Sequence, residues 1–116
     1  DECLIHENYK EKLLKASDVS TMVTGKSMGD AVRCLKTPFS KKFFKMEYDP
    51  AVPKEEVLDF GKGAMRKAVF DGDNMGSYLA GEVAGMIHKK ESAKDIVEDI
   101  MGGAEKLLKN APSLVK

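Results

Sequence analysis

Residues 72–85, here called the glycine-rich segment, constrain this chain most, because glycine stands where a helix would begin and then recurs inside it. Glycine in a helix interior costs about 1 kcal/mol relative to alanine, so its repeated use indicates that something approaches the backbone closely. Ser77, Gly81 and Gly85 lie four residues apart and would share one face of a helix over residues 77–88. We predict a helix with a nearly bare face, which either packs tightly against another helix or admits a cofactor.

The bulk composition indicates a small globular domain or a piece of a larger one. A chain of 116 residues with 42% hydrophobic content can form a core. Its 19 basic residues balance 19 acidic ones, which argues against nucleic acid or a membrane as a partner bound by bulk charge. No apolar run approaches the roughly 18 residues of a membrane span, and no secretory leader is present, so we expect a cytoplasmic protein. The chain does not begin with methionine, and we expect it to be a fragment.

The first 50 residues show patterns of a short helix followed by a small hairpin. Asn8 is placed to cap an amphipathic helix that runs to about Ala16. Alternating residues over 19–24 and 31–36 predict two strands joined by a six-residue connection. Pro38 would end this pairing. The aromatic and apolar residues after it predict a short helix or turn that covers the hairpin: Phe39, Phe43, Phe44 and Met46.

The remaining residues predict helices. Pro53 is placed to open a helix that runs to about Phe70, and the glycine-rich segment would supply the next one. Ser92 and Asp95 form the pattern of a capping box for a third helix, whose apolar stripe extends toward Pro112. The predicted fold is therefore α+β and mostly helical, with a small β-hairpin, covering helices, and two or three long C-terminal helices.

A calcium loop is one possible interpretation of the turn after residue 70. Four residues fit positions one, three, six and twelve of an EF-hand loop: Asp71, Asp73, Gly76 and Glu82. Positions five and nine are Met75 and Leu79, which supply no side-chain oxygen. A calcium-binding or other non-enzymatic helical module is therefore the alternative from a different class of function.

The chain shows no complete metal or catalytic set of its own. Cys3 and His6 have a ligand-like spacing, but Cys34 and His88 are scattered, and a zinc site needs three or four ligands. We expect no metal, reduced cysteines, and a capping role for His88 at a helix end. Because the sequence holds no catalytic triad pattern, Walker loop or dinucleotide fingerprint, we expect no catalytic residue in this segment and no activity from it alone.

A basic cluster with interleaved aromatic residues lies between residues 26 and 45. Only Asp30 opposes six basic residues there: Lys26, Arg33, Lys36, Lys41, Lys42 and Lys45. Lysine-rich surfaces are often simply a solvated face above a small core. The alternative is a docking surface for an acidic or phosphorylated partner. The pattern by itself leaves both interpretations open.

Short motifs occur along most of the chain in a fixed order: NYKEK (8–12), DV (18–19), TG (24–25), AVR (31–33), LK (35–36), GA (63–64), AV (68–69), GD (72–73), GS (76–77) and AGEVAG (80–85). Together they resemble the C-terminal part of the enoyl-acyl-carrier-protein reductase II and nitronate monooxygenase (2-nitropropane dioxygenase) family. The closer likeness is to the enoyl reductase branch. Two positions depart from it, since Glu82 stands where many members have glutamine and Asp30 where close relatives often have histidine.

The resemblance implies a place in a larger flavoenzyme. Family members are FMN-dependent TIM-barrel oxidoreductases in which a small α/β domain covers the flavin and final helices pack on the barrel. Residues 1–50 would be this lid, and residues 51–116 would close onto a barrel whose strands are not in this chain. The resemblance places Met75, Ser77 and Gly81 at the cofactor-binding rim. FMN and NAD(P)H would belong to the parent protein, and the segment alone would hold neither.

The resemblance also implies a reaction and partners. The parent would be an enoyl-acyl-carrier-protein reductase, which passes a hydride from NAD(P)H through flavin to an enoyl thioester. The alternative within the family is a nitronate monooxygenase, which uses the same flavin with oxygen. Expected partners are the remainder of the barrel, a substrate bound to acyl carrier protein or coenzyme A, and a second copy in a homodimer. Lys41, Lys42 and Lys45 would face the acidic carrier protein.

Overall fold

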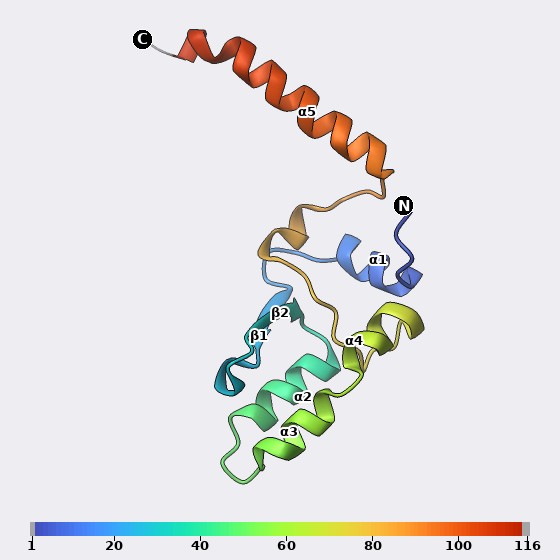
Figure 1. Cartoon of the computed structure of the whole chain (residues 1–116), viewed down its shortest axis with the longest axis vertical. Helices are drawn as coiled ribbons and strands as arrows, with labels where there is room; N and C mark the ends of the chain where they lie inside the picture. Colours follow the sequence, from blue (N-terminus) through green and yellow to red (C-terminus); the bar gives the residue numbers. More distant parts are fainter. Residues whose placement is uncertain (1, 115–116) are drawn as a thin grey trace. The chain divides into compact units, whose positions relative to one another are not determined.

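The computed structural model describes residues 2–114, and their contacts divide them into two compact units. One unit is Ile5–His88, and the other comprises the residues up to Leu4 together with those from Lys89 onward. Figure 1 shows the order of the elements, which are mostly helices with one two-stranded sheet. The predicted α+β class is confirmed. Among the described residues, no helix is both long and apolar enough to cross a membrane.

The predicted hairpin is present in the larger unit. Strands β1 (Thr21–Thr24) and β2 (Val32–Leu35) pair antiparallel, with Thr21 opposite Leu35 and Thr24 opposite Val32. The connection has seven residues rather than six, because β2 begins at Val32. The sheet is extended by a single bridge between Cys34 and Leu79, so a third stretch of chain lies against β2.

The hairpin loop has a defined conformation of its own. It contains a single 3-10 turn, Lys26–Met28, between Gly25 at φ 80° and Gly29 at φ 79°. A side chain at Gly25 would also collide with the carbonyl oxygen of Asp30. Glycine is therefore required at this position by both the backbone angle and the space.

Helix α1 (Glu7–Leu14) begins two residues earlier than predicted. Its N-cap is His6, whose Nδ1 accepts a hydrogen bond from the Asn8 backbone N–H at 3.1 Å. The prediction that Asn8 caps the helix is wrong, because the Asn8 side chain is used elsewhere. Its Nδ2 donates to the carbonyl oxygen of Gly72 at 3.2 Å and so joins α1 to the glycine-rich segment.

Helix α2 (Pro38–Glu47) covers the hairpin, as the sequence predicted. Thr37 and Ser40 form a reciprocal capping box at its start, with proline in the first turn. Helix α3 (Lys54–Gly61) packs against α2. The rings of Phe39 and Phe60 stack between these helices with their centroids 5.2 Å apart.

The predicted helix from Pro53 to Phe70 is interrupted. Pro53 is the N-cap of α3 rather than its first residue, and α3 ends at Gly61. Gly63 has φ 71°, which no right-handed helix contains, and it separates α3 from the short α4 (Ala64–Arg66) and a π-helical turn, Lys67–Asp71. The apolar residues of this region are therefore divided among α3, α4 and the π-helical turn rather than lying on one continuous helix.

The predicted helix over residues 77–88 is wrong. Its first half is extended, with the Leu35 N–H donating to the Tyr78 carbonyl at 2.8 Å and the Ala80 N–H to the Arg33 carbonyl at 3.2 Å. Only Glu82–Met86 coils, as a 3-10 helix. Because these backbone groups form hydrogen bonds with β2, residues 77–81 are not helical, and Ser77, Gly81 and Gly85 share no helical face. The capping role predicted for His88 is also wrong, because His88 is exposed beyond the end of this turn.

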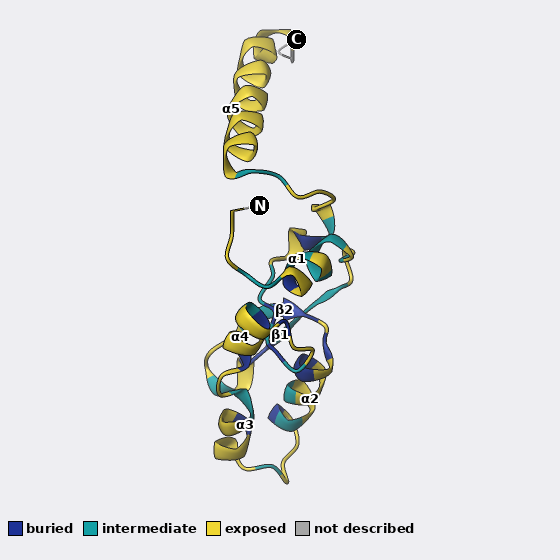
Figure 2. Ribbon diagram, turned by 90° about the vertical axis from the view of Figure 1, so that its right-hand side faces the viewer, coloured by how far each residue is buried: buried dark blue, intermediate teal, exposed yellow. Residues whose placement is uncertain are grey.

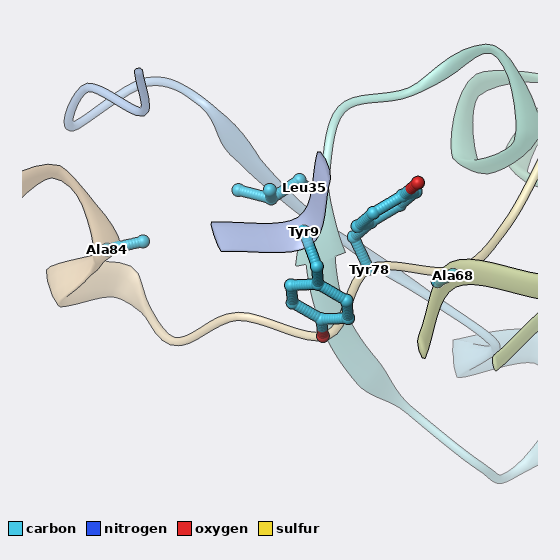
Figure 3. Packing of buried hydrophobic residues seen from close by; sticks show 5 residues of the cluster. All are labelled: Tyr9, Leu35, Ala68, Tyr78 and Ala84. Atoms are coloured by element: carbon cyan, nitrogen blue, oxygen red, sulfur yellow. The ribbon is translucent and has the colours of Figure 1, made fainter. Parts of the chain in front are cut away.

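The main hydrophobic core joins distant parts of the larger unit (Figure 3). The rings of Tyr9 and Tyr78 lie 4.8 Å apart at their centroids. The Tyr9 hydroxyl donates to the Leu79 carbonyl at 2.7 Å, and the Tyr78 hydroxyl donates to the Asp73 carbonyl at 2.9 Å. The two tyrosines thus bury apolar rings and satisfy backbone carbonyls of the glycine-rich segment. The cluster is completed by Leu35, Ala68 and Ala84.

The second unit contains the long helix α5 (Ala93–Asn110), followed by a 3-10 turn, Ala111–Leu114. Ser92 is its N-cap and accepts a hydrogen bond from the Asp95 N–H at 3.0 Å, as predicted. The Glu2 carboxylate accepts from the Ala93 N–H at 2.9 Å, which lowers the pKa of Glu2. Among the described residues α5 is the single long C-terminal helix, so the prediction of two or three is wrong.

Candidate functional site

Three glycines of the glycine-rich segment are explained by this chain's own packing. A Cβ on Gly76 would lie 2.5 Å from the backbone nitrogen of Ala68, and one on Gly85 would lie 2.6 Å from the carbonyl carbon of Ser17. Gly72 adopts φ 61°, a left-handed conformation that favours glycine. The close approach predicted from sequence is therefore real at these positions, but the approaching atoms belong to the same chain.

Gly81 is different from its neighbours. It is exposed and has φ −71°, which any residue can adopt. Apart from Gly81 itself and its two chain neighbours, no atom of the described chain lies within 4 Å of where its Cβ would stand. Nothing in this unit requires glycine here, and the backbone surface at Gly81 is open to a neighbouring group.

The other two residues predicted at the cofactor rim lie on the same stretch of chain. Met75 is half-buried in a turn, where its N–H donates to the Asp73 carboxylate at 2.9 Å. The Ser77 N–H donates to the Ala64 carbonyl at 2.9 Å, which fixes the backbone at that point. Ser77 lines a cleft, whereas Met75 and Gly81 lie outside its lining.

This cleft has a volume of about 440 Å³ and lies entirely within the larger unit. Its walls come from the hairpin loop, α2, α3, α4 and the extended residues 77–79. Most of the lining is apolar, notably Met28, Val32, Phe43, Leu58, Met65 and Leu79. Thr24, Asp30, Lys62 and Ser77 add polar groups. Its size and lining are those of a small-molecule site, which typically occupies about 300–1,000 Å³.

The sequence did not predict this cleft. Helical spacing identified Phe39 and Phe43 as residues that cover the hairpin, and Val57 as part of a second helix. The cleft forms because the helix breaks at Gly63 and because the chain, after α4 and the π-helical turn, runs extended over residues 77–79. Neither feature follows from local spacing.

Glu47 holds the hairpin loop, which forms one wall of the cleft. Its Oε2 accepts a hydrogen bond from the Gly25 N–H at 2.9 Å, and its Oε1 accepts from the Ser27 N–H at 2.7 Å. The side chain is buried, and charge-assisted bonds of this kind are stronger than neutral ones. Sequence reasoning missed Glu47. A lone acidic residue at a helix end gives no local signal of a partner twenty residues away.

Arg33 and Glu82 form an ion pair beside the open glycine. Arg33 Nη2 lies 2.6 Å from Glu82 Oε1, and Arg33 Nη1 donates to the Thr21 hydroxyl at 3.1 Å. Glu82 directly follows Gly81, so the pair fixes the start of the 3-10 turn against β2. Glu82, which stands where many members of the resembling family have glutamine, therefore has Arg33 as its ion-pair partner in this chain.

The basic cluster predicted between residues 26 and 45 is not one uniform surface. Arg33 is paired with Glu82, and Lys36 Nζ donates to the Val19 carbonyl at 2.7 Å. Lys41, Lys42 and Lys45 remain together as exposed side chains of α2. The ammonium of Lys42 lies 4.8 Å from the centroid of the Phe60 ring, a cation–π arrangement.

The described residues also include two cysteines and several side chains that could bind a metal. Cys34 is buried, and burial raises the pKa of its thiol, while Cys3 is exposed; both are free. Burial, together with the nearby charge of Asp73, raises the pKa of Tyr78. In the part of the chain that the structure describes, no three His, Cys, Asp or Glu residues are placed to hold a metal. The calcium loop considered as an alternative would also lead into extended chain rather than a second helix.

Comparison with known proteins identifies the family. Residues 1–103 match the family model described as nitronate monooxygenase, and the chain belongs to this family. The resemblance found in the sequence motifs is thereby confirmed. A search of curated proteins gave no match.

Two solved structures match nearly the whole chain. FabK from Thermotoga maritima is 34% identical with a TM-score of 0.87, over 96% of this chain and 35% of that one. A point mutant of the same FabK is 31% identical with a TM-score of 0.75, over 96% of this chain and 32% of the mutant chain. The chain therefore spans about a third of the length of these proteins.

Proposed function

We propose that this chain is the C-terminal part of an FMN-dependent oxidoreductase that reduces enoyl thioesters with NAD(P)H. The observation that carries the proposal is the match of 96% of the chain to FabK at a TM-score of 0.87. The family match and the ordered motifs of the enoyl reductase branch support it further. On this proposal residues 1–50 belong to a lid, and residues 51–116 close onto the barrel.

The cofactor rim on this proposal comprises Met75, Ser77 and Gly81. The open backbone at Gly81 leaves room for a flat ring system, because no atom beyond the adjacent residues of the chain approaches within 4 Å of its missing Cβ. The hydrogen bonds of the Met75 and Ser77 N–H groups hold the rest of the rim in place. When bound, FMN supplies the hydride chemistry between nicotinamide and substrate, while the phosphate site and catalytic residues belong to the rest of the parent.

The apolar stripe of α5 is the surface proposed to close on the barrel. Every residue of this helix is exposed, as the yellow colour of α5 in Figure 2 shows. The stripe includes Ile96, Val97, Ile100, Met101, Leu107 and Leu108. An amphipathic helix with an exposed apolar side needs a partner surface, and the remainder of the parent protein would provide it. The homodimer and the cytoplasmic location stay predictions.

The full-length protein tests the reaction directly. We expect it to be yellow and to oxidise NADH or NADPH only when an enoyl thioester is supplied. The second candidate is a nitronate monooxygenase, because the matching family model carries that description. Oxygen consumption with an alkyl nitronate, without thioester-dependent oxidation of NADH or NADPH, would favour it. A colourless protein that binds no FMN would contradict both.

The lysines of α2 are proposed to steer an acidic carrier protein. Lys41, Lys42 and Lys45 are exposed and close in sequence, and complementary charge accelerates encounter. Reversing all three to glutamate should raise KM for the substrate bound to acyl carrier protein but not for the coenzyme A ester. Reversal of Lys54, Lys67 and Lys106, which are also exposed, is the control for net charge. An equal rise in KM for both substrates would contradict docking at α2.

A further inference from the structure

We propose that the 440 Å³ cleft binds the acyl chain of the thioester substrate. The inference rests on the proposed function and adds to it the place of the substrate's hydrocarbon part. The cleft is built from this chain alone, between the hairpin loop, α2, α3, α4 and residues 77–79.

The chemistry of the lining favours a hydrocarbon. The walls are mainly side chains without hydrogen-bonding groups, including two phenylalanines, Phe39 and Phe43, and two methionines, Met28 and Met65. Among the described residues, no buried side-chain nitrogen or oxygen lacks a hydrogen-bond partner. The buried polar side chains therefore need no ligand as a hydrogen-bond partner, and the polar groups of the lining are confined to Thr24, Asp30, Lys62 and Ser77. Burial of each methylene in such a site contributes about 0.8 kcal/mol, which is about a three- to fourfold change in affinity.

The size suits an extended chain of medium length. A volume of 440 Å³ equals that of about fifteen water molecules at roughly 30 Å³ each. A methylene group is similar in size to a water molecule, so a chain of about ten carbons would fit with space to move. Methionine side chains adapt to flexible apolar ligands, and Met28 and Met65 stand on different walls.

The cleft is open on one side and firmly built on the other. Leu58 and Met65 are 53% and 55% exposed, so a bound chain would cover apolar surface that now faces solvent. Another wall is the hairpin loop, which the buried carboxylate of Glu47 holds at Gly25 and Ser27. A ligand would therefore enter a preformed site and gain burial mainly at Leu58 and Met65.

The cleft is continuous with the proposed rim. Ser77 and Leu79 line it, and they lie on the same extended stretch that carries Met75 and Gly81. The backbone there is fixed by pairing with β2. A thioester whose reactive end lies at the rim would thus have its acyl chain beside Ser77, which belongs to both the rim and the cleft lining.

Chain-length dependence in the full-length enzyme tests this assignment. The measurement is kcat/KM for 2-enoyl coenzyme A esters of four to twelve carbons. We compare the wild type with the double variant Leu58→Trp and Met65→Trp, which fills the open side of the cleft. The matched control is Glu55→Trp with Arg66→Trp, because both residues are exposed on α3 and α4 but lie outside the lining.

The cleft-filling variant should lower the ratio of kcat/KM for the ten-carbon over the four-carbon ester by about tenfold, while the control keeps the wild-type ratio. Leu58→Ala should move the preference toward longer chains. Titration calorimetry with decanoyl coenzyme A, which cannot be reduced, should show the same order of affinities without turnover. Unchanged ratios and affinities in an active enzyme would overturn the acyl-chain site. A wild type that reduces no enoyl thioester would instead overturn the proposed function itself.

Discussion

The second half of the glycine-rich segment and helix α5 each contain two glycines, but only α5 is a continuous helix. Gly102 and Gly103 lie inside α5 with no other atoms near their missing Cβ positions. Gly81 and Gly85 lie in a stretch that is extended and then briefly coiled. The number of glycines is the same, but the hydrogen-bond partners of the two stretches differ. Residues 78–80 bond to β2, whereas α5 bonds to itself.

This chain contains one region whose structure is specified locally and another whose structure depends on long-range contacts. Helix α5 is specified locally, by the Ser92 cap and an amphipathic pattern. The unit Ile5–His88 depends on contacts between residues far apart in sequence, such as Tyr9 with Leu79 and Glu47 with Gly25. Substitutions that break long-range contacts should therefore cost stability in the larger unit, and substitutions that improve local propensity should act in α5.

The largest effect is expected for Gly76→Val. A Cβ at this position would lie 2.5 Å from the backbone of Ala68, which cannot move without disturbing the π-helical turn. We expect a loss of about 3 kcal/mol or more in the free energy of unfolding, measured by urea denaturation. Gly81→Val is the control, since its Cβ meets nothing within 4 Å. Equal losses at both positions would refute the assignment of the close approach to Gly76.

A smaller loss is expected for Glu47→Gln. The uncharged amide would replace two charge-assisted bonds to the Gly25 and Ser27 N–H groups and would place an NH₂ against a donor. We expect a loss of about 2 kcal/mol in the free energy of unfolding and faster amide hydrogen exchange in the hairpin loop. Glu55→Gln, at an exposed site on α3, is the matched control. Unchanged exchange at residues 25–29 would show that the loop holds its shape without Glu47.

Tyr78→Phe is expected to cost about 1 kcal/mol, because the buried hydroxyl donates to the Asp73 carbonyl. The pH dependence provides a second readout. Burial raises the pKa of Tyr78 above its ordinary value of 10.0, so the unfolded chain loses this proton first as pH rises. The contribution to stability is complete below pH 10 and declines above it. The loss of stability between neutral pH and pH 11 should therefore be smaller in the variant than in the wild type.

The smallest effect, and one of opposite sign, is expected in α5. Gly102→Ala should stabilise the helix by about 0.8 kcal/mol, because alanine has the higher helix propensity and its Cβ meets nothing. Far-ultraviolet circular dichroism during thermal unfolding measures the change in helicity. Gly81→Ala should give no such gain, since that residue precedes the 3-10 turn in extended conformation. A gain at Gly81 equal to that at Gly102 would remove the distinction between the two regions.

Local patterns were sufficient for elements that satisfy their own backbone. The hairpin, the helix after Pro38 and the cap of α5 at Ser92 were all predicted, because alternation, proline and capping residues act within a few positions. The helix over residues 77–88 was wrong because its small residues suit helix packing and extended pairing equally well. Helix propensity depends on neighbouring residues in the sequence, so it does not include hydrogen bonding to β2, which is distant in sequence.

The candidate site was only partly accessible from sequence. Motif resemblance identified the family and the stretch that holds Met75, Ser77 and Gly81. It did not reveal the cleft or the carboxylate of Glu47, because their parts come from five segments that meet only in space. The role of the three predicted rim residues stays a prediction.

By itself, the sequence determined the family, the α+β class, the hairpin and the capped amphipathic helix α5. Within the glycine-rich segment, the tertiary structure decided which glycines are crowded and which one is open. Gly76 and Gly85 lie against Ala68 and Ser17, respectively, while Gly81 faces away from the chain. The physical reason is that local propensity acts over one or two turns, whereas the space available to a Cβ depends on segments that are distant in sequence.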